Sequence, residues 1–538
     1  MIKEYDIVIV GAGAAGSAAA YNLSKLCLKV LLIEQGDFIK SEDYPSWNKN
    51  WEYKKFKEFS SDPNLRNNKA DYPIYYKNSD IHLANYNGIG GSTILYSGHY
   101  PRFKPSDFKI KTNENIGEDW PIDYDELYPY YIKNENLIGV SGLIGDPIYP
   151  EESFGKILEP LPIGESGKKL AKSFNDLNWH WWPSYSAIIS RSHDGREKCI
   201  NIGTCNAGCP QDAKSSADNT YIRKAINNIE IITNCRVVDI NIKDDKVRGL
   251  EYINLNNNKS TIIKSKIIIL AASGVGTPKI LLTSNSYQGI SNSSGLVGKN
   301  LMLHPLGYVE GKFNEDLKSN SGPQGCMIFS HEFSSSPNSN SHKRGFTIQA
   351  LKGSSQIETV INGINRRSYK IGNNINDYLS EHFNKTIGLG LIVEDLPEES
   401  NQIKLSDELY DSSGYKSIEV TYKVSENSKK IMNFALKKGI ELMNNAGAEK
   451  VYSAGPVKNT GWHILGTTKM GDDPKNSVVN KFGESHDINN LYIFDGSVFP
   501  TSSSVNPANT IQSLSLFFSE KLKERIIENN IDNSSSKL

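Results

Sequence analysis

The sequence has 538 residues, of which 38% are hydrophobic and 22% charged, and its formal net charge is -1. This length exceeds what one hydrophobic core usually supports, so two domains are expected, and the composition is globular, not disordered. The near-neutral charge argues against nucleic acid or an anionic membrane as the main partner. The sequence shows neither a secretory signal nor an apolar run of the ~20 residues that a spanning helix needs. It therefore predicts a cytoplasmic protein, with export alongside a signal-bearing partner as the alternative.

The N-terminus carries a glycine-rich turn between a strand and a helix. Residues 5–10 form an apolar, β-branched run typical of a buried parallel strand, and residues 17–26 predict a helix. The turn reads GAGAAG, with Gly11, Gly13 and Gly16. Gly11 permits the tight turn, Gly13 lets the backbone approach a pyrophosphate, and Gly16 lets the helix pack closely on the strand. The helix N-terminus then offers N–H groups to phosphates.

A second strand, predicted over residues 29–36, carries Glu34 eighteen residues after Gly16. A carboxylate at this distance can accept hydrogen bonds from the adenosine ribose hydroxyls, and it would repel a 2′-phosphate. The strand, turn, helix and acid together predict a dinucleotide site. The turn alone does not separate FAD from NAD, and plain structural packing is the competing interpretation.

Further glycine-rich corners lie far along the chain. The segment from residue 88 reads GIGGST and contains Gly88, Gly90 and Gly91; such a loop can lie against a planar ligand or a pyrophosphate, or be an ordinary surface loop. Residues 266–282 predict a strand, a small-residue turn and a helix that Pro278 opens.

Two C-terminal blocks complete the pattern. GWHILG places His463 in a glycine-bounded loop, and NLYIFDGS predicts a strand that ends at Asp495 and Gly496. VNPANT places Asn506 directly before the last helix, where an asparagine can also cap that helix.

Taken together, these motifs resemble the glucose–methanol–choline (GMC) oxidoreductase family over the whole chain. GAGAAG with Glu34 is similar to its FAD fingerprint and GIGGST to its first signature. AASGVGTPKILL is similar to its second signature, although Ser284-Asn285 replaces the usual Ser-Gly. The segments YSGHYPRFKPSDF and CNAGCPQDAKSSADNTYIRKA resemble the flavoprotein subunits of gluconate, sorbitol and fructose dehydrogenases, with pyranose oxidase more distant.

The resemblance implies an α/β plus α+β architecture: a Rossmann-like, GMC-type FAD-binding domain interleaved with an antiparallel-sheet substrate domain. We expect residues 1–110, 191–305 and 456–538 in the first domain and residues 111–190 and 306–455 in the second. Residues 314–345 are rich in Ser, Asn and Gly and predict a loop or lid. The polar stretch 529–538 predicts a disordered tail.

The cofactor that the resemblance implies is FAD. It would be bound non-covalently, because Leu95 stands where relatives with covalent FAD have a histidine. The residues expected at the cofactor are Gly11, Gly13, Ala14, Ala15, Gly16, Glu34, Gly88, Gly90, Gly91, Ser92, Tyr96, Ser97, Val237, Ala272, Asp495, Gly496, Asn506, Pro507 and Thr510.

The predicted chemistry is oxidation of a CH–OH group on a sugar, polyol, aldonate or aminosugar-like substrate. His463 is the candidate base for the hydroxyl proton, with the hydride passing to flavin N5. Asn506 is the candidate donor to the substrate oxygen, which gives the His–Asn pair of some relatives. His99 and His304 are secondary candidates; His304 is predicted to be structural, and His99 could lie near the flavin.

Other functions stay open at this point. A NAD-dependent dehydrogenase would explain the N-terminus alone, a non-redox GMC lyase would keep FAD, and a non-catalytic flavin-binding subunit would not need His463. The electron acceptor (oxygen, a quinone, a cytochrome or a redox protein) and the oligomeric state do not follow from the sequence.

Six cysteines are too few for a disulfide framework in a chain of this length. Cys199, Cys205 and Cys209 cluster, and three thiolates could hold an iron–sulfur cluster. Their spacing matches no standard pattern, so they could equally be small buried side chains or include a disulfide pair. No metal site is predicted.

Overall fold

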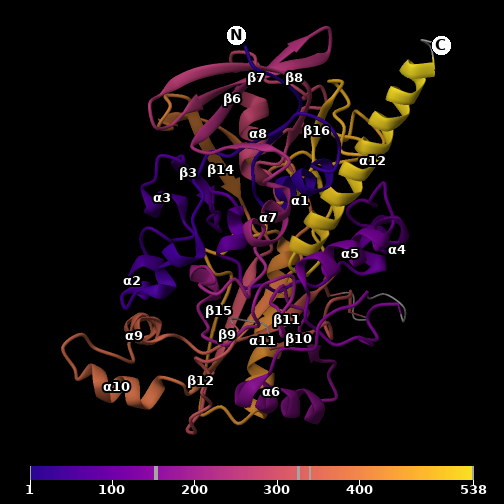
Figure 1. The fold of residues 1–538 in the computed structure, drawn as a ribbon. Coiled ribbons are helices and arrows are strands. Elements are labelled where there is room, and N and C mark those ends of the chain that lie inside the picture. Colours follow the sequence, from indigo (N-terminus) through magenta and orange to yellow (C-terminus); the bar gives the residue numbers. More distant parts are fainter. Residues whose placement is uncertain (1, 151–154, 324–326, 338–340, 536–538) are drawn as a thin grey trace.

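The computed structural model describes residues 2–150, 155–323, 327–337 and 341–535 (Figure 1). Three sheets organise this part of the chain, and each is built from strands that lie far apart in the sequence. In Figure 1 the N-terminal strand and the β6–β8 ribbon lie at one end of the molecule and α6 at the other.

The first sheet is mainly parallel and has the order β5-β2-β1-β8-β7-β6, with β16 pairing β8. β1 lies between β2 and β8 and pairs both in parallel, whereas β6 and β7 continue the sheet as an antiparallel ribbon. Its strands are β1 (Glu4–Val10), β2 (Val30–Ile33), β5 (Glu230–Ile232), β6 (Cys235–Lys243), β7 (Lys246–Asn254), β8 (Lys259–Leu270) and β16 (Leu491–Ile493).

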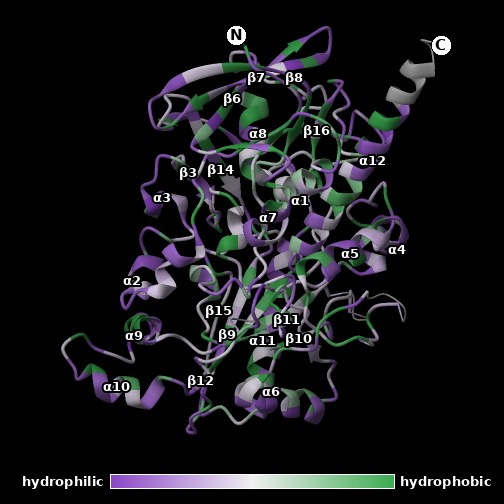
Figure 2. Cartoon of the chain, viewed as in Figure 1, coloured by the Kyte–Doolittle hydropathy of each residue, from purple (hydrophilic) through white to green (hydrophobic). Residues whose placement is uncertain are grey.

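Two helices pack together beside this sheet. Helix α1 (Ala14–Leu23) consists mostly of small residues, and its contacts with α12 (Ala508–Ser535) bring the two ends of the chain together. A Cβ atom at Gly16 would lie 1.8 Å from the carbonyl oxygen of Gly11, so only glycine allows α1 to sit this close to the turn. β1 and β2 are almost entirely buried, as expected of parallel strands covered on both faces, whereas the β6–β8 ribbon carries both hydrophobic and hydrophilic stretches (Figure 2).

The second sheet is antiparallel and has the order β15-β9-β12-β11-β10-β4. Helix α11 (Glu426–Asn445) packs on it, and α6 (Gly164–Asp176) packs on α11. Its strands are β4 (Trp182–Pro183), β9 (Leu306–Lys312), β10 (Ile328–Ser330), β11 (Phe346–Leu351), β12 (Thr386–Val393) and β15 (Lys450–Ala454). The predicted pairing of a Rossmann-like sheet with an antiparallel second sheet is confirmed.

A third, three-stranded sheet connects the two predicted domains. β14 (Lys416–Tyr422) pairs in parallel with β3 (Ile74–Ser79) and antiparallel with β13 (Gln402–Tyr410). β3 belongs to the stretch predicted for the FAD domain, and β13 and β14 belong to the stretch predicted for the substrate domain. β13 and β14 also contact α8 (Ser273–Thr283) at the edge of the first sheet.

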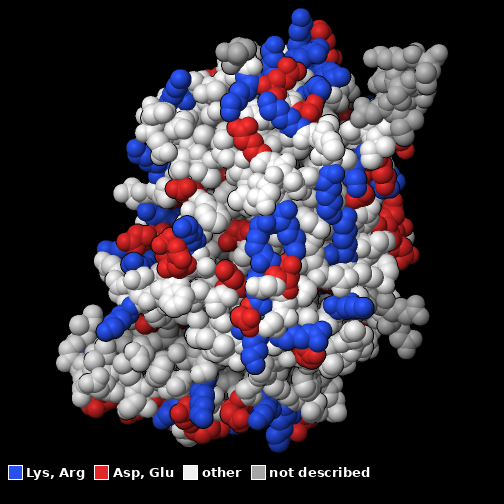
Figure 3. All heavy atoms as spheres, in the orientation of Figure 1, with Lys and Arg blue, Asp and Glu red and all other residues white. Residues whose placement is uncertain are grey.

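The other α-helices are α5 (Tyr124–Ile138), which packs against α12 and contributes to the core of the first sheet, and several shorter helices. The shorter helices are α2 (Trp51–Lys55), α3 (Pro63–Arg66), α4 (Ile110–Glu114), α7 (Arg223–Ala225), α9 (Gln356–Asn365) and α10 (Ile375–His382). Among the described helices, none is both long and apolar enough to cross a bilayer. Figure 3 shows basic and acidic side chains interspersed on the visible face, in keeping with the balanced charge.

Two sequence predictions fall partly outside the described residues. The predicted loop or lid, 314–345, contains the undescribed residues 324–326 and 338–340, and its described part includes strand β10. The predicted disordered tail, 529–538, overlaps the last turns of α12, and residues 536–538 lie outside the description.

Candidate active site

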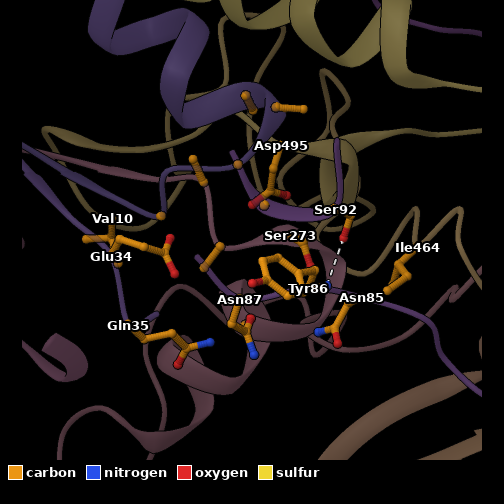
Figure 4. A pocket seen from close by; sticks show the side chains of 18 of the residues that line it. Val10, Glu34, Gln35, Asn85, Tyr86, Asn87, Ser92, Ser273, Ile464 and Asp495 are labelled. Atoms are coloured by element: carbon orange, nitrogen blue, oxygen red, sulfur yellow. Dashed lines mark hydrogen bonds between the residues drawn. The ribbon is translucent and has the colours of Figure 1, made fainter. Parts of the chain in front are cut away.

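A deep cavity lies where the carboxyl ends of β1, β2 and β8 meet the N-terminus of α1. Its wall extends from the N-terminal glycine turn to His463 and Asp495, so one cavity joins the dinucleotide motif to the C-terminal blocks. Its wall includes the predicted residues Gly11, Gly13, Ala14, Ala15, Glu34, Gly91, Ser92, Val237, Ala272, His463, Asp495, Gly496 and Pro507. Segments separated by hundreds of residues thus share one wall, and Figure 4 shows Glu34, Tyr86 and Asp495 around the same space.

Two glycine turns shape the cavity. Gly11 has φ +99°, and a Cβ atom there would lie 2.5 Å from the carbonyl oxygen of Ala271. Gly91 has φ +53°, and its Cβ atom would lie 2.7 Å from the Cα atom of Gly13. The N-terminal turn and the GIGGST loop therefore approach each other backbone to backbone, which only glycine permits.

The donors and acceptors of the cavity suit a dinucleotide. Gly13 caps α1 without any side-chain hydrogen bond, so the first N–H groups of the helix lack a capping side chain where they meet the cavity. The buried Glu34 accepts hydrogen bonds from the N–H groups of Ala12, at 2.8 Å, and Gly36, at 2.9 Å. Burial raises the pKa of Glu34, and these backbone bonds oppose the shift. The residues present therefore fit the pyrophosphate and ribose of FAD.

Several predicted cofactor residues lie outside the described cavity wall. Gly16 packs against the turn, and the N–H group of Gly90 donates to the carbonyl of Ala12 at 2.9 Å. The Thr510 hydroxyl shares a 2.8 Å hydrogen bond with the Tyr131 hydroxyl. Gly88 forms a β-bridge with Asp37, and the Tyr96 hydroxyl donates to the carbonyl of Ser215. Ser97 and Asn506 also lie outside the wall.

The cavity also has wall residues that the sequence did not predict. Asn85, Tyr86 and Asn87 directly precede GIGGST, so their position beside that motif was the available signal. Arg236 and Lys279 both form salt bridges to Asp411, at 3.1 and 2.9 Å, and thereby attach the loop that joins β13 and β14 to the cavity. No local pattern could have indicated these long-range pairs. Trp462, which precedes His463 in the sequence, is a further wall residue that the sequence did not predict.

At the far end of the cavity, His463 forms a hydrogen-bonded pair with His304. Their Nδ1 atoms lie 2.8 Å apart. The Nε2 atom of His304 lies 2.7 Å from the carbonyl oxygen of Ser503 and 3.1 Å from that of Ser502. Because carbonyl oxygens only accept, Nε2 of His304 must carry a hydrogen.

This arrangement fixes the tautomer of His463. Burial lowers the pKa of His304 to about 4, so its ring is neutral and its Nδ1 atom has a lone pair. His463 must then donate from Nδ1 to His304. Burial, together with the neighbouring His304 and His99, lowers the pKa of His463 well below its ordinary value. The neutral His463 ring therefore presents an unprotonated Nε2 atom on its other side.

Asn506 lies on that other side. Its Nδ2 atom is 3.3 Å from His463 Nε2, and its Oδ1 atom accepts a hydrogen bond from Gln349 Nε2 on β11. Both contacts are satisfied by one amide orientation, with NH₂ toward His463. The two predicted catalytic residues are thus brought together although 43 positions separate them.

The backbone near this pair is unusual. His304 and Ser503 have φ values of +51° and +57°, a region that residues other than glycine rarely adopt. Such conformations cost of order 1–3 kcal/mol each and concentrate at functional sites. The His304–Ser503 hydrogen bond therefore joins two residues held in unfavourable conformations beside His463.

Cys205 is buried, and Cys199 and Cys209, which are partly buried, are free thiols. Cys199 and Cys205 share one apolar cluster, and Cys199 and Cys209 pack against another. Burial raises the pKa of Cys199 to about 11, which favours the thiol over the thiolate that metals bind. Within the described part of the chain, no group of three or more His, Cys, Asp or Glu residues is placed to hold a metal ion.

Comparisons with known proteins identify the family of this chain. Two family models described as GMC oxidoreductase match residues 182–306 and 397–515, and a model described as NAD(P)-binding Rossmann-like domain matches residues 9–67. The chain belongs to the GMC oxidoreductase family, and it is an FAD-dependent oxidoreductase.

Two of its relatives match almost end to end. The chain is 33% identical to 2-methyl-1,2-propanediol dehydrogenase of Mycolicibacterium austroafricanum, over 97% of this chain and 96% of that protein. It is 26% identical to the fructose dehydrogenase large subunit of Gluconobacter japonicus, over 95% and 96%. The solved structure of pyridoxine 4-oxidase from Mesorbium loti shares the fold, with a TM-score of 0.63 at 19% identity over 96% of this chain and 99% of that one.

Proposed function

We propose that this protein oxidises a CH–OH group of a polyol or sugar-like substrate, with His463 as the base that removes the hydroxyl proton. The observation that carries the proposal is the 3.3 Å contact between the Asn506 amide and His463 Nε2, a ring nitrogen in the wall residue His463 that the His304 contacts leave unprotonated. The names of the relatives, a diol dehydrogenase and a fructose dehydrogenase subunit, support this substrate class.

FAD, when bound, supplies the hydride acceptor for the carbinol carbon. The protein's own residues remove the hydroxyl proton and stabilise the substrate oxygen. The neutral His463 accepts the hydroxyl proton at Nε2 while its Nδ1–H stays bonded to His304, which disperses the positive charge that develops on the ring. The Asn506 NH₂ group donates to the substrate oxygen as negative charge develops there, and Gln349 holds the amide in that orientation.

We further propose that FAD is held without a covalent bond to residue 95. Leu95 is buried and packs in an apolar cluster with Tyr44 and Ile94, so the position offers no nucleophile. Denaturing the yellow protein in acid and separating it from small molecules tests this. All flavin absorbance should appear in the soluble fraction, and flavin that stays with the precipitated chain would contradict the proposal.

The test of the function is an anaerobic screen of FAD-loaded protein with sugars, polyols, aldonates and aminosugars. At least one compound should bleach the long-wavelength absorbance of the flavin. His463→Asn should bind FAD normally but reduce it about 10²–10⁴-fold more slowly, the usual effect of losing a general base.

Two results would overturn the proposal. A flavin that no alcohol bleaches would favour the non-redox lyase or the flavin-binding subunit. Wild-type rates in His463→Asn would remove His463 from the base role.

A further inference from the structure

A second histidine, His99, lies beside the proposed site with an unmet hydrogen bond. Its side chain is buried, and its Nδ1 atom lies 2.9 Å from the Ser184 hydroxyl oxygen. Its Nε2 atom has no protein partner. Either direction of the Ser184 bond leaves Nε2 able to make one more hydrogen bond, as acceptor or as donor. Buried polar atoms of this kind call for a specific explanation.

A chain of contacts places His99 near the reacting groups. The His99 ring lies 6.2 Å from the ring of Phe329 on β10. Phe329 pairs with Gln349 on β11, and directly paired residues of antiparallel strands point to the same face. Gln349 donates to Asn506, which contacts His463. The face of the second sheet that carries Phe329 is therefore the face toward His463.

The electrostatics agree with this placement. After burial and His304, His99 is the third group that lowers the pKa of His463, in keeping with the contacts above. Burial lowers the pKa of His99 itself to about 3, which keeps its ring neutral. His331, whose ring lies 4.8 Å from that of Phe329, also has an unpartnered ring nitrogen, but its pKa is lowered by burial and then by Lys104 and His180, not by His463. Of these two histidines, His99 is the one associated with His463.

We propose that His99 Nε2 binds a second hydroxyl of the substrate and so makes this protein selective for diols and polyols over simple alcohols. The carbinol oxygen that reacts is already engaged by His463 and Asn506, so His99 needs another oxygen. The Phe329 ring, 6.2 Å from that of His99, would contact the substrate carbons. This inference rests on the proposed function and names its substrate class more narrowly.

The test compares 1,2-propanediol with 1-propanol in the FAD-loaded enzyme. The wild type should favour the diol in kcat/KM by about 10-fold or more, the effect of one well-placed hydrogen bond to substrate. Two matched variants separate the ring nitrogens. An asparagine side chain reaches the position of Nδ1 and keeps the Ser184 bond, whereas a glutamine side chain reaches the position of Nε2.

His99→Asn should therefore lose the preference, mainly through a higher KM for the diol, with little change for 1-propanol. His99→Gln should retain most of it. FAD content, measured by absorbance, should be equal in all three proteins.

Other outcomes would overturn the inference. The inference would be wrong if the wild type showed no preference for the diol, or if His99→Asn lowered kcat/KM equally for both alcohols. Either result would mean that His99 only packs against its neighbours. Weaker FAD binding with an unchanged preference would mean that His99 faces the cofactor. These results differ from failure of the proposed function, in which no alcohol in the screen reduces the flavin at all.

Discussion

The hydrogen bond from His463 to His304 gives the sharpest prediction. If His304 becomes leucine, the Nδ1–H group of His463 has no acceptor, and a buried unpaired donor costs about 1–3 kcal/mol. The ring then favours the other tautomer, with hydrogen on Nε2, which cannot accept the substrate proton. At 1.4 kcal/mol per tenfold change, the reactive tautomer becomes about 5- to 150-fold rarer.

His304→Asn is the matched control. Asparagine tolerates the positive φ of this position, and its carboxamide oxygen can lie where Nδ1 of His304 lies. Stopped-flow reduction of FAD-saturated enzyme by a saturating polyol is the assay. The leucine variant should lose about 5- to 150-fold in the reduction rate, and the asparagine variant should recover most of it. Wild-type rates in His304→Leu, or equally slow rates in both variants, would refute the tautomer argument.

Further predictions concern the cofactor cavity and pH. Glu34→Gln should weaken FAD binding about 10- to 150-fold in equilibrium dialysis, since hydrogen bonds to a charged group contribute about 1.5–3 kcal/mol; unchanged affinity would contradict the role of the carboxylate. Gly91→Ala should yield protein depleted of FAD, because its Cβ atom would lie 2.7 Å from Gly13, whereas Gly414→Ala, also at positive φ but in open space, should keep its FAD. The depressed pKa of His463 keeps the base form present as pH falls, so kcat/KM should stay level from alkaline pH down past 6.5 and decline only in more acidic solution. A decline that begins at or above pH 6.5 would show that the pKa of His463 is not depressed.

Much of the first sheet could be predicted from local sequence. Residues 5–10 form β1 (Glu4–Val10), and the strand predicted over 29–36 contains β2 (Val30–Ile33), because a run of β-branched residues before a glycine turn has few alternatives. Gly11 has the positive φ that a tight turn requires. These features depend on neighbours in sequence, which a single chain displays directly.

The relations within the site could not be predicted in the same way. His304 was expected to be structural, yet it meets His463 across 159 positions. No sequence motif includes Gln349, yet its side chain orients Asn506, which lies 157 positions away in the sequence. Such contacts depend on how the antiparallel sheet docks onto the cavity, and no period or spacing in the chain encodes that docking. The third sheet, in which β3 pairs with the distant β14, follows from the same kind of long-range packing.

The most direct test of the account is flavin reduction by a polyol that carries deuterium at the carbon to be oxidised. We expect the deuterated substrate to reduce the flavin more slowly than the ordinary one in anaerobic stopped flow, because the bond to that hydrogen breaks as the hydride leaves. Equal rates at saturating concentrations of both substrates would contradict rate-limiting hydride removal from the carbinol carbon facing His463 and Asn506.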